Sequence, residues 1–169
     1  MDELKKIKII DSKNYSKIVK NFSCKAMELD NYLKKKAYID MLDAKSVTYL
    51  LFKDDELFGF YTLNISQVEE DEPNDDGEIE SLNYLELKYL GIDIKYQNKG
   101  IGSTVMKEII IPEVKEYFDF LNLVRGLFII PLNDKARNFY SKFGFETLKF
   151  ATYNGEEIEY LWIDFLPKK

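Results

Sequence analysis

Two glycines one residue apart, Gly100 and Gly102, stand between a stretch typical of a β-strand and a stretch typical of a helix. Glycine has no Cβ, so the chain can turn tightly there and a ligand can approach the main chain. The first N–H groups of a helix lack intrahelical partners, and its dipole favours an anion at that end. Residues 92–102, IDIKYQNKGIG, therefore predict a cradle for a phosphate group. The spacing Gln-x-x-Gly-x-Gly matches neither the Rossmann fingerprint nor a P-loop, and alone it also suits a structural turn.

A second segment further along the chain, NDKARNFYSKFGF, begins at Asn133 and ends in Phe143-Gly144-Phe145. The order of strand, Gln-x-x-Gly-x-Gly turn, helix, strand, Asn and a short helix with Phe-Tyr and Gly-Phe resembles the GNAT superfamily of N-acetyltransferases. The flanking hairpin and last strand also fit, so the resemblance covers nearly the whole chain. It implies an α/β (α+β) fold, with a mixed, mostly antiparallel sheet of six to seven strands, splayed in the middle and flanked by helices.

The resemblance also implies the donor, acetyl-CoA, and a metal-free reaction in which a primary amine attacks the thioester directly. In this family the CoA pyrophosphate lies on main-chain amides of the turn, which here are those of residues 98–103. The exposed main chain of residues 90–92 would pair with the pantetheine arm, and Gly91 suits a β-bulge. The cofactor-binding residues implied are Leu90, Gly91, Ile92, Gln97, Asn98, Lys99, Gly100, Ile101, Gly102, Ser103 and Asn133.

Two further residues are candidates for catalysis. Tyr140 matches the family tyrosine that protonates the departing CoA thiolate, and a main-chain N–H near Ile92 would meet the oxyanion. Outside the motif, Tyr140 would be read as a core aromatic, because phenylalanines surround it in the sequence. Glu86, on the strand before the turn, is the best-placed acid for a general base, and it equally suits a solvent-facing strand position.

The first third of the chain narrows the choice of acceptor substrate. Phe22-Ser23-Cys24, then LDNYL from Leu29, and FGFYTL from Phe58 resemble a GNAT branch that includes toxins of toxin–antitoxin modules. Those toxins acetylate the amino group of aminoacyl-tRNA. Three functions stay open: acetylation of a small-molecule or peptide amine, acetylation of aminoacyl-tRNA by a toxin with a small antitoxin partner, and non-catalytic binding of acyl-CoA.

Charge gives weak support to a tRNA acceptor. The chain has two arginines, and Lys34-Lys35-Lys36 is its one compact basic cluster, whereas a tRNA binder should present clustered Lys and Arg. Residues 69–80, EEDEPNDDGEIE, hold eight of the acids and no base. This acidic segment suits a solvated loop, a rim that attracts a cationic amine, or the docking point of a basic partner.

Composition excludes several classes of protein. The chain of 169 residues has no histidine and one cysteine, so it lacks Ser-His-Asp and Cys-His chemistry, imidazole or thiolate zinc sites, and internal disulfides. Cys24, without a histidine partner, is expected to be a buried structural thiol rather than a nucleophile. We expect a single domain over residues 1–169 in the cytoplasm, with no membrane span or signal peptide. Exposed sheet edges make a homodimer plausible.

The hydrophobic pattern predicts strands alternating with helices in the second half of the chain. Pro112 should bend or divide the helix that begins near Gly100, widen it, or reshape the exit of the CoA site. The expected strands are 4–10, 46–52, 57–68, 82–94, 121–130 and 157–165, and the expected helices are 25–45, 134–143 and the one that begins near Gly100.

Overall fold

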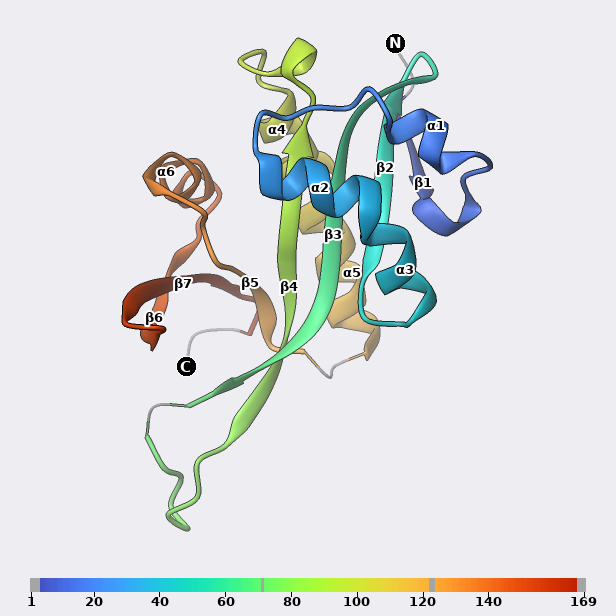
Figure 1. The fold of residues 1–169 in the computed structure, drawn as a ribbon. Helices are drawn as coiled ribbons and strands as arrows, with labels where there is room; N and C mark the ends of the chain where they lie inside the picture. Colours follow the sequence, from blue (N-terminus) through green and yellow to red (C-terminus); the bar gives the residue numbers. More distant parts are fainter. Residues whose placement is uncertain (1–3, 71, 122–123, 167–169) are drawn as a thin grey trace. The chain divides into compact units, whose positions relative to one another are not determined.

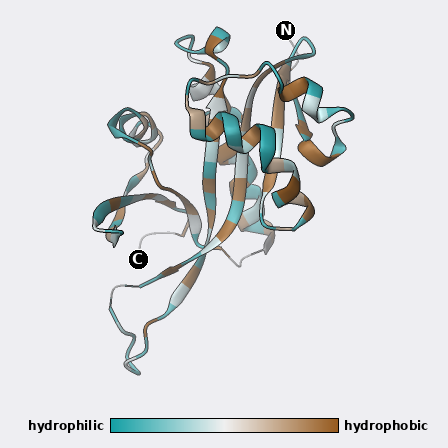
Figure 2. Cartoon of the chain, in the orientation of Figure 1, coloured by the Kyte–Doolittle hydropathy of each residue, from teal (hydrophilic) through white to brown (hydrophobic). Residues whose placement is uncertain are grey.

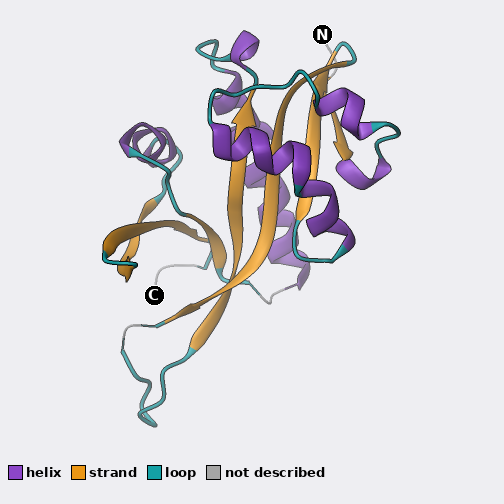
Figure 3. Cartoon of the chain, in the orientation of Figure 1, coloured by secondary structure: helices purple, strands orange, loops and turns teal. Residues whose placement is uncertain are grey.

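The computed structural model describes residues 4–70, 72–121 and 124–166. Asp71 of the acidic segment and residues 122 and 123 of the expected strand 121–130 lie outside these ranges. The helices are α1 (Tyr15–Val19), α2 (Met27–Lys35), α3 (Ala37–Leu42), α4 (Ile101–Thr104), α5 (Ile111–Leu121) and α6 (Asp134–Ser141) (Figure 1). The strands are β1 (Leu4–Lys8), β2 (Val47–Lys53), β3 (Glu56–Glu69), β4 (Ser81–Ile92), β5 (Gly126–Ile129), β6 (Glu146–Tyr153) and β7 (Glu156–Asp164) (Figure 3).

The seven strands of the described chain form one sheet in the order β1-β2-β3-β4-β5-β7-β6. The pairs β1–β2, β2–β3, β5–β7 and β6–β7 are antiparallel, whereas β4 and β5 are parallel, with Leu85 opposite Leu127 and Glu86 opposite Phe128. A parallel pair requires a crossover, and α4 and α5 supply it. The expected mixed, mostly antiparallel sheet flanked by helices is confirmed.

The chain divides into two compact units, each with its own core. Unit 1 contains residues 1–64 and 87–104, and unit 2 contains residues 65–86 and 105–169. In unit 1, the apolar faces of α1 and α2 pack with β2 and β3; the buried members of this core are Ile9, Val19, Phe22, Cys24, Leu29, Tyr32, Leu33, Ala37, Leu50, Phe52 and Phe60. In unit 2, a smaller core gathers Val68, Tyr84 and Phe128, against which Leu82, Leu148, Tyr160 and Trp162 pack.

The helix after the glycine turn changes its pitch. α4 passes without a break into a π-helical segment, Val105–Ile110, which continues as α5. Pro112 lies just after the π-helical segment, and proline both lacks an N–H and crowds the carbonyl four residues earlier. Pro112 therefore gives a physical reason for the wider turns, and the helix is widened rather than divided.

Several boundaries differ from the expected ones. The helix expected over 25–45 is interrupted at Lys36, whose φ of −120° and ψ of −36° leave the helical region. Leu121, expected in a strand, ends α5, and β5 is only four residues long. Beyond Glu69, which ends β3, the described residues of the acidic segment lie in the connection to β4, where hydrophilic residues predominate (Figure 2). No helix of the described residues is long and apolar enough to cross a membrane.

Candidate functional site

The glycine turn lies directly after β4, in unit 1. A short 3₁₀ turn, Ile94–Tyr96, follows the strand, and α4 begins at Ile101. Gly100 has φ of +76° and accepts the first helical bond, from the N–H of Thr104 at 3.1 Å. Asn98 is also left-handed, with φ of +59°. Residues 98–100 are exposed and 101–103 half-buried, so a ligand can reach the main chain that the sequence singled out.

Gly91 is required by packing. A Cβ at this position would stand 2.5 Å from Cε1 of Phe60 and 3.1 Å from its Cδ1. Real Cβ atoms do not approach a ring so closely, so the β4 main chain at residues 90–92 lies against Phe60 only because Gly91 has no side chain. The bulge expected at Gly91 stays a prediction.

Gln97 has a side chain that binds the protein itself. Its Nε2 donates to the carbonyl of Ile92 at 2.8 Å and to that of Cys24 at 3.0 Å. Cys24 is buried, and desolvation raises the pKa of its thiol from 9.0 to about 11. A thiol protonated at neutral pH is a poor nucleophile, which agrees with a structural role.

In unit 2, Asn133 and Tyr140 mark the two ends of α6. Asn133 is the N-cap residue, and its Oδ1 accepts from the N–H of Ala136 at 2.9 Å. Tyr140 is buried and makes edge-to-face contacts with Phe139 and Phe145. Burial raises the pKa of the Tyr140 phenol above its usual value, so the group keeps its proton at neutral pH, as a general acid must.

Arg137 anchors α6 one turn before Tyr140. Its Nε and Nη2 donate to the two carboxylate oxygens of Glu159 on β7 at 2.7 and 3.1 Å. Thr147 on β6 donates to the same carboxylate at 2.7 Å. This fork-shaped pairing holds the helix that carries the candidate acid against two strands of unit 2.

Glu86 has a partner that the sequence did not reveal. Ser66 on β3 donates its hydroxyl to Glu86 Oε2 at 2.8 Å. Glu86 is half-buried and pairs in register with Phe128 across the β4–β5 ladder. Ser66 could not be found from sequence, because its place opposite Glu86 depends on the register of β3 and β4 around the acidic loop.

The comparisons with known proteins cover most of the chain. The profile described as the acetyltransferase (GNAT) family matches residues 15–145, more than half of the chain. The chain belongs to this family. The GNAT resemblance seen in the turn and in the Asn133 segment is thereby confirmed, and with it the N-acetyltransferase class of enzyme.

One relative is a tRNA-acetylating toxin, and the solved structures with a similar fold include those of the toxin AtaT. The "tRNA-acetylating toxin" of Mycobacterium tuberculosis (strain ATCC 25618 / H37Rv) is 30% identical over 134 residues, which are 76% of this chain and 78% of that protein. AtaT complexed with acetyl-methionyl-tRNAfMet has a TM-score of 0.78 at 23% identity, covering 96% and 95% of the two chains. A Tyr-to-Phe mutant of AtaT bound to the C-terminus of the antitoxin AtaR and to acetyl-CoA has a TM-score of 0.75 at 23% identity, covering 96% and 94%. The two solved structures confirm the fold.

The site residues expected from the sequence fall into two sets by unit. Residues 90–92 and 97–103 belong to unit 1, whereas Glu86, Asn133 and Tyr140 belong to unit 2. Within the described ranges, no group of three or more Cys, Asp and Glu residues is arranged to hold a metal ion.

Proposed function

We propose that this GNAT enzyme transfers the acetyl group of acetyl-CoA to the α-amino group of aminoacyl-tRNA, as the toxin of a toxin–antitoxin module. The observation that carries the proposal is the match over 76% of the chain to a protein described as a tRNA-acetylating toxin. The motifs FSC, LDNYL and FGFYTL in the first third point to the same branch. A tRNA acceptor also implies that the enzyme acts in the cytoplasm, where charged tRNA is used.

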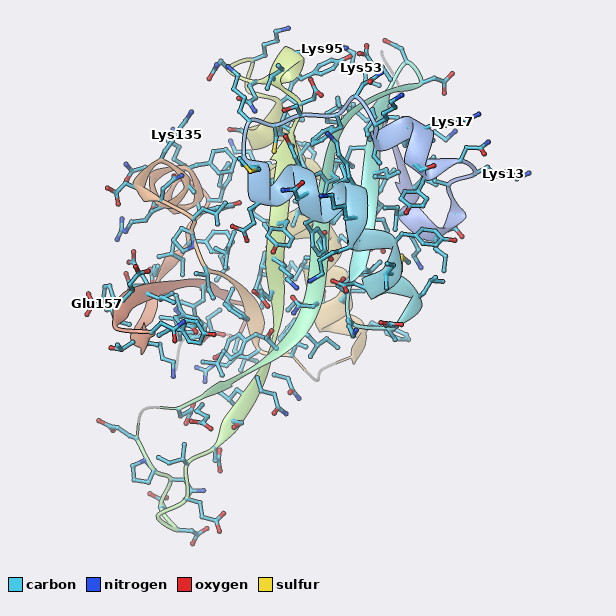
Figure 4. All side chains as sticks on the ribbon, viewed as in Figure 1. Lys13, Lys17, Lys53, Lys95, Lys135 and Glu157 are labelled. Carbon is cyan, nitrogen blue, oxygen red and sulfur yellow. The ribbon has the colours of Figure 1, made fainter. Side chains whose placement is uncertain are left out.

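The distribution of charge supports a polyanionic acceptor better than the total of −6 does. Unit 1 has 15 lysines against 11 acidic residues, whereas unit 2 has 9 basic and 19 acidic residues. The lysine surplus therefore belongs to the unit that carries the glycine turn. Lys13 and Lys17 extend from the α1 region of unit 1 into solvent (Figure 4). Phosphate contacts by such lysines would supply the sequence-independent part of tRNA affinity.

The residues fit acetyl-CoA as the donor. The left-handed turn at Asn98 and Gly100 leaves the main chain of residues 98–103 accessible, and we assign the pyrophosphate to its amides. The main chain of residues 90–92 takes the pantetheine arm, and Asn133 also contacts the donor. Bound acetyl-CoA supplies an activated acetyl group as a thioester.

The remaining steps use one main-chain N–H and two side chains. As the amine attacks the thioester carbonyl, a main-chain N–H near Ile92 stabilises the charge on the acyl oxygen. The C–S bond breaks, and Tyr140 donates its phenolic proton to the leaving sulfur. The amine loses one proton, which Glu86 accepts directly or through water. Ser66 holds the Glu86 carboxylate in place at 2.8 Å.

A labelling experiment tests the proposal. Purified protein is incubated with [¹⁴C]acetyl-CoA and either charged tRNA, uncharged tRNA, free amino acids or a short peptide. We expect label in charged tRNA alone, recovered as N-acetyl amino acid after mild alkaline hydrolysis of the ester. Label in the peptide or the free amino acids but not in charged tRNA would instead identify a small-amine or peptide acetyltransferase. Acetyl-CoA binding without transfer to any acceptor would indicate a non-catalytic acyl-CoA module.

A small antitoxin is the protein partner that this proposal implies. AtaT, which shares the fold, is described in complex with the C-terminus of its antitoxin. Growth arrest on induction of the protein, relieved by coexpression of a short reading frame beside its gene, is the expected result. Homodimer formation stays a prediction, to be tested by sedimentation.

A further inference from the structure

The segment from Phe22 to Asp30 carries two of the branch motifs, FSC and the start of LDNYL, and the proposed chemistry uses neither. In unit 1 this segment is hydrogen-bonded to the chain that enters the glycine turn. We infer that Gln97 is a positioning residue for acetyl-CoA, and that Asp30, acting through Ser23 and Cys24, is the anchor that holds it. The inference rests on the proposed acetyl-CoA site.

Asp30, on α2, fixes residues 23 and 24. Its Oδ2 accepts from Ser23 Oγ at 2.8 Å, and its Oδ1 accepts from the N–H of Cys24 at 2.9 Å and from Cys24 Sγ at 3.2 Å. Burial opposes ionisation, but the bonds from Cys24 and Ser23 hold the pKa of the Asp30 carboxyl below its usual value. A charged acceptor makes stronger bonds than a neutral one, so the main chain of this short loop is held firmly.

The fixed loop is then joined to the end of β4. Asp93, buried at 5% exposure, accepts from the N–H of Ser23 at 3.1 Å and from that of Lys95 at 3.0 Å. In return, the N–H of Ile94 donates to the carbonyl of Ser23 at 2.9 Å. Two residues of the 3₁₀ turn are therefore tied directly or through Asp93 to one residue of the N-terminal segment.

Gln97 completes the connection. One amide nitrogen donates to both the Ile92 carbonyl and the Cys24 carbonyl, so both of its hydrogens are used. The bond to Ile92 joins the two ends of the 3₁₀ turn, and the bond to Cys24 ties that turn to the anchored loop. Residue 97 immediately precedes the left-handed Asn98, so its position decides where the amides of 98–103 begin.

A preformed turn has a specific energetic consequence. If the amides that receive the pyrophosphate are already ordered, less conformational entropy is lost on binding. Gln97 would then contribute to the affinity for the diphosphate part of CoA without contacting the reacting thioester. Loss of the Gln97 side chain should weaken the binding of acetyl donors that contain the diphosphate and leave unchanged the binding of donors that lack it.

The test compares two acetyl donors, acetyl-CoA and S-acetylpantetheine, in variants of two glutamines. Gln97→Met keeps the length of the side chain and removes the donor, and Gln67→Met is the matched control, since exposed Gln67 donates to Asn83 in unit 2. We expect Gln97→Met to raise the Kd for acetyl-CoA, measured by calorimetry, about tenfold. Its KM for S-acetylpantetheine should change less than twofold, as should its kcat at saturating acetyl-CoA. Gln67→Met should leave all three values unchanged.

A second variant guards against a simple folding defect. Asp30→Asn keeps the shape of the anchor but removes its charge and one acceptor oxygen, so we expect a smaller rise in the Kd for acetyl-CoA, about threefold. An unchanged Kd in a folded Gln97→Met protein, or an equal loss with S-acetylpantetheine, would overturn the positioning role alone. No acetyl-CoA binding by the wild type would overturn the proposed function as well.

Discussion

The two units hold their functional groups in different ways. In unit 1, the candidate groups are main-chain amides, exposed at Asn98 and Gly100 and kept in place by side chains that hydrogen-bond to carbonyls. In unit 2, the candidates are side chains: Tyr140 is buried among aromatics, and Glu86 is paired with Ser66. Unit 1 also has the surplus of lysine, and unit 2 the surplus of acid.

This difference between exposed main-chain amides and buried or paired side chains matches two requirements of acetyl transfer, donor binding and proton transfer. Binding a diphosphate and a polyanion requires accessible donors and positive charge, which an exposed, lysine-rich surface provides. Donating a proton requires a group that is protonated before the reaction, and burial favours the neutral form of the Tyr140 phenol. Substitutions at the glycine turn of unit 1 should therefore change binding, and substitutions at Tyr140 or Glu86 of unit 2 should change the rate of the chemical step.

The largest effect is expected at Tyr140. Tyr140→Phe removes the proton donor but keeps the ring, so kcat should fall roughly 10²–10⁴-fold while the Kd for acetyl-CoA changes less than twofold. Steady-state kinetics and calorimetry give the two values. Tyr84→Phe, another buried tyrosine of unit 2 packed on Phe128, is the control and should keep its kcat. A Tyr140→Phe protein with more than half of the wild-type kcat would show that Tyr140 is not the proton donor.

A smaller effect is expected from lysines of unit 1. Lys35→Gln/Lys36→Gln should lower kcat/KM for charged tRNA several-fold and reduce the slope of log(kcat/KM) against log[salt] by about one per lost phosphate contact. Lys34 is left intact because its charge acts on the Asp30 anchor. The matched control in unit 2 is Lys107→Gln/Lys115→Gln, two exposed helix positions. Equal losses in both double variants would show that the charge difference between the units has no role in tRNA binding.

The anchoring of α6 should give a more modest change. Arg137→Lys keeps the positive charge but loses the two-pronged pairing with Glu159. The Arg137 side chain is 42% exposed, so solvent screens this ion pair and the loss of stability should be small. A fall in Tm of about 1–3 °C, measured by calorimetry, is expected, together with a lower kcat and an unchanged Kd for acetyl-CoA. If the Kd rises instead, α6 serves binding rather than the chemical step.

Cys24 offers the mildest test, since its thiol takes no part in the proposed chemical steps. With a pKa of about 11 rather than 9.0, the thiolate fraction at pH 8 is lower by about a hundredfold. Alkylation by iodoacetamide should be slower than in the guanidinium-unfolded protein by at least that factor, as followed by mass spectrometry. Equal rates in the two states would show that residues 23 and 24 are not held as described.

Much of the fold follows from local patterns in the sequence, and the exceptions are instructive. The β2–β3 hairpin and the helix at Asp134 were predictable because apolar side chains recur at strand and helix spacing. β6 was not predicted, since its residues are mostly exposed and show little alternation. One signal was present: Asn154-Gly155, with φ of 52° and 81°, forms the two-residue turn that joins β6 to β7.

The site divides in the same way. The glycine turn and Tyr140 could be proposed from the sequence because each lies within a short motif. Ser66, Arg137 and Asp30 could not, because their roles depend on partners far along the chain: Glu86, Glu159 and, through Cys24, Gln97. Such pairs depend on strand register and loop packing, and neither can be deduced from local sequence.

The most direct measurement is calorimetric titration with acetyl-CoA of the wild type and of Gly100→Glu/Gly102→Glu, which introduces side chains and negative charge at the turn. Gly155→Glu is the control, because Gly155 has a similar φ of +81° and open space around it in unit 2. We expect micromolar binding by the wild type and by Gly155→Glu, and none by the folded double variant. Wild-type affinity in the double variant would contradict the assignment of the glycine turn to the donor.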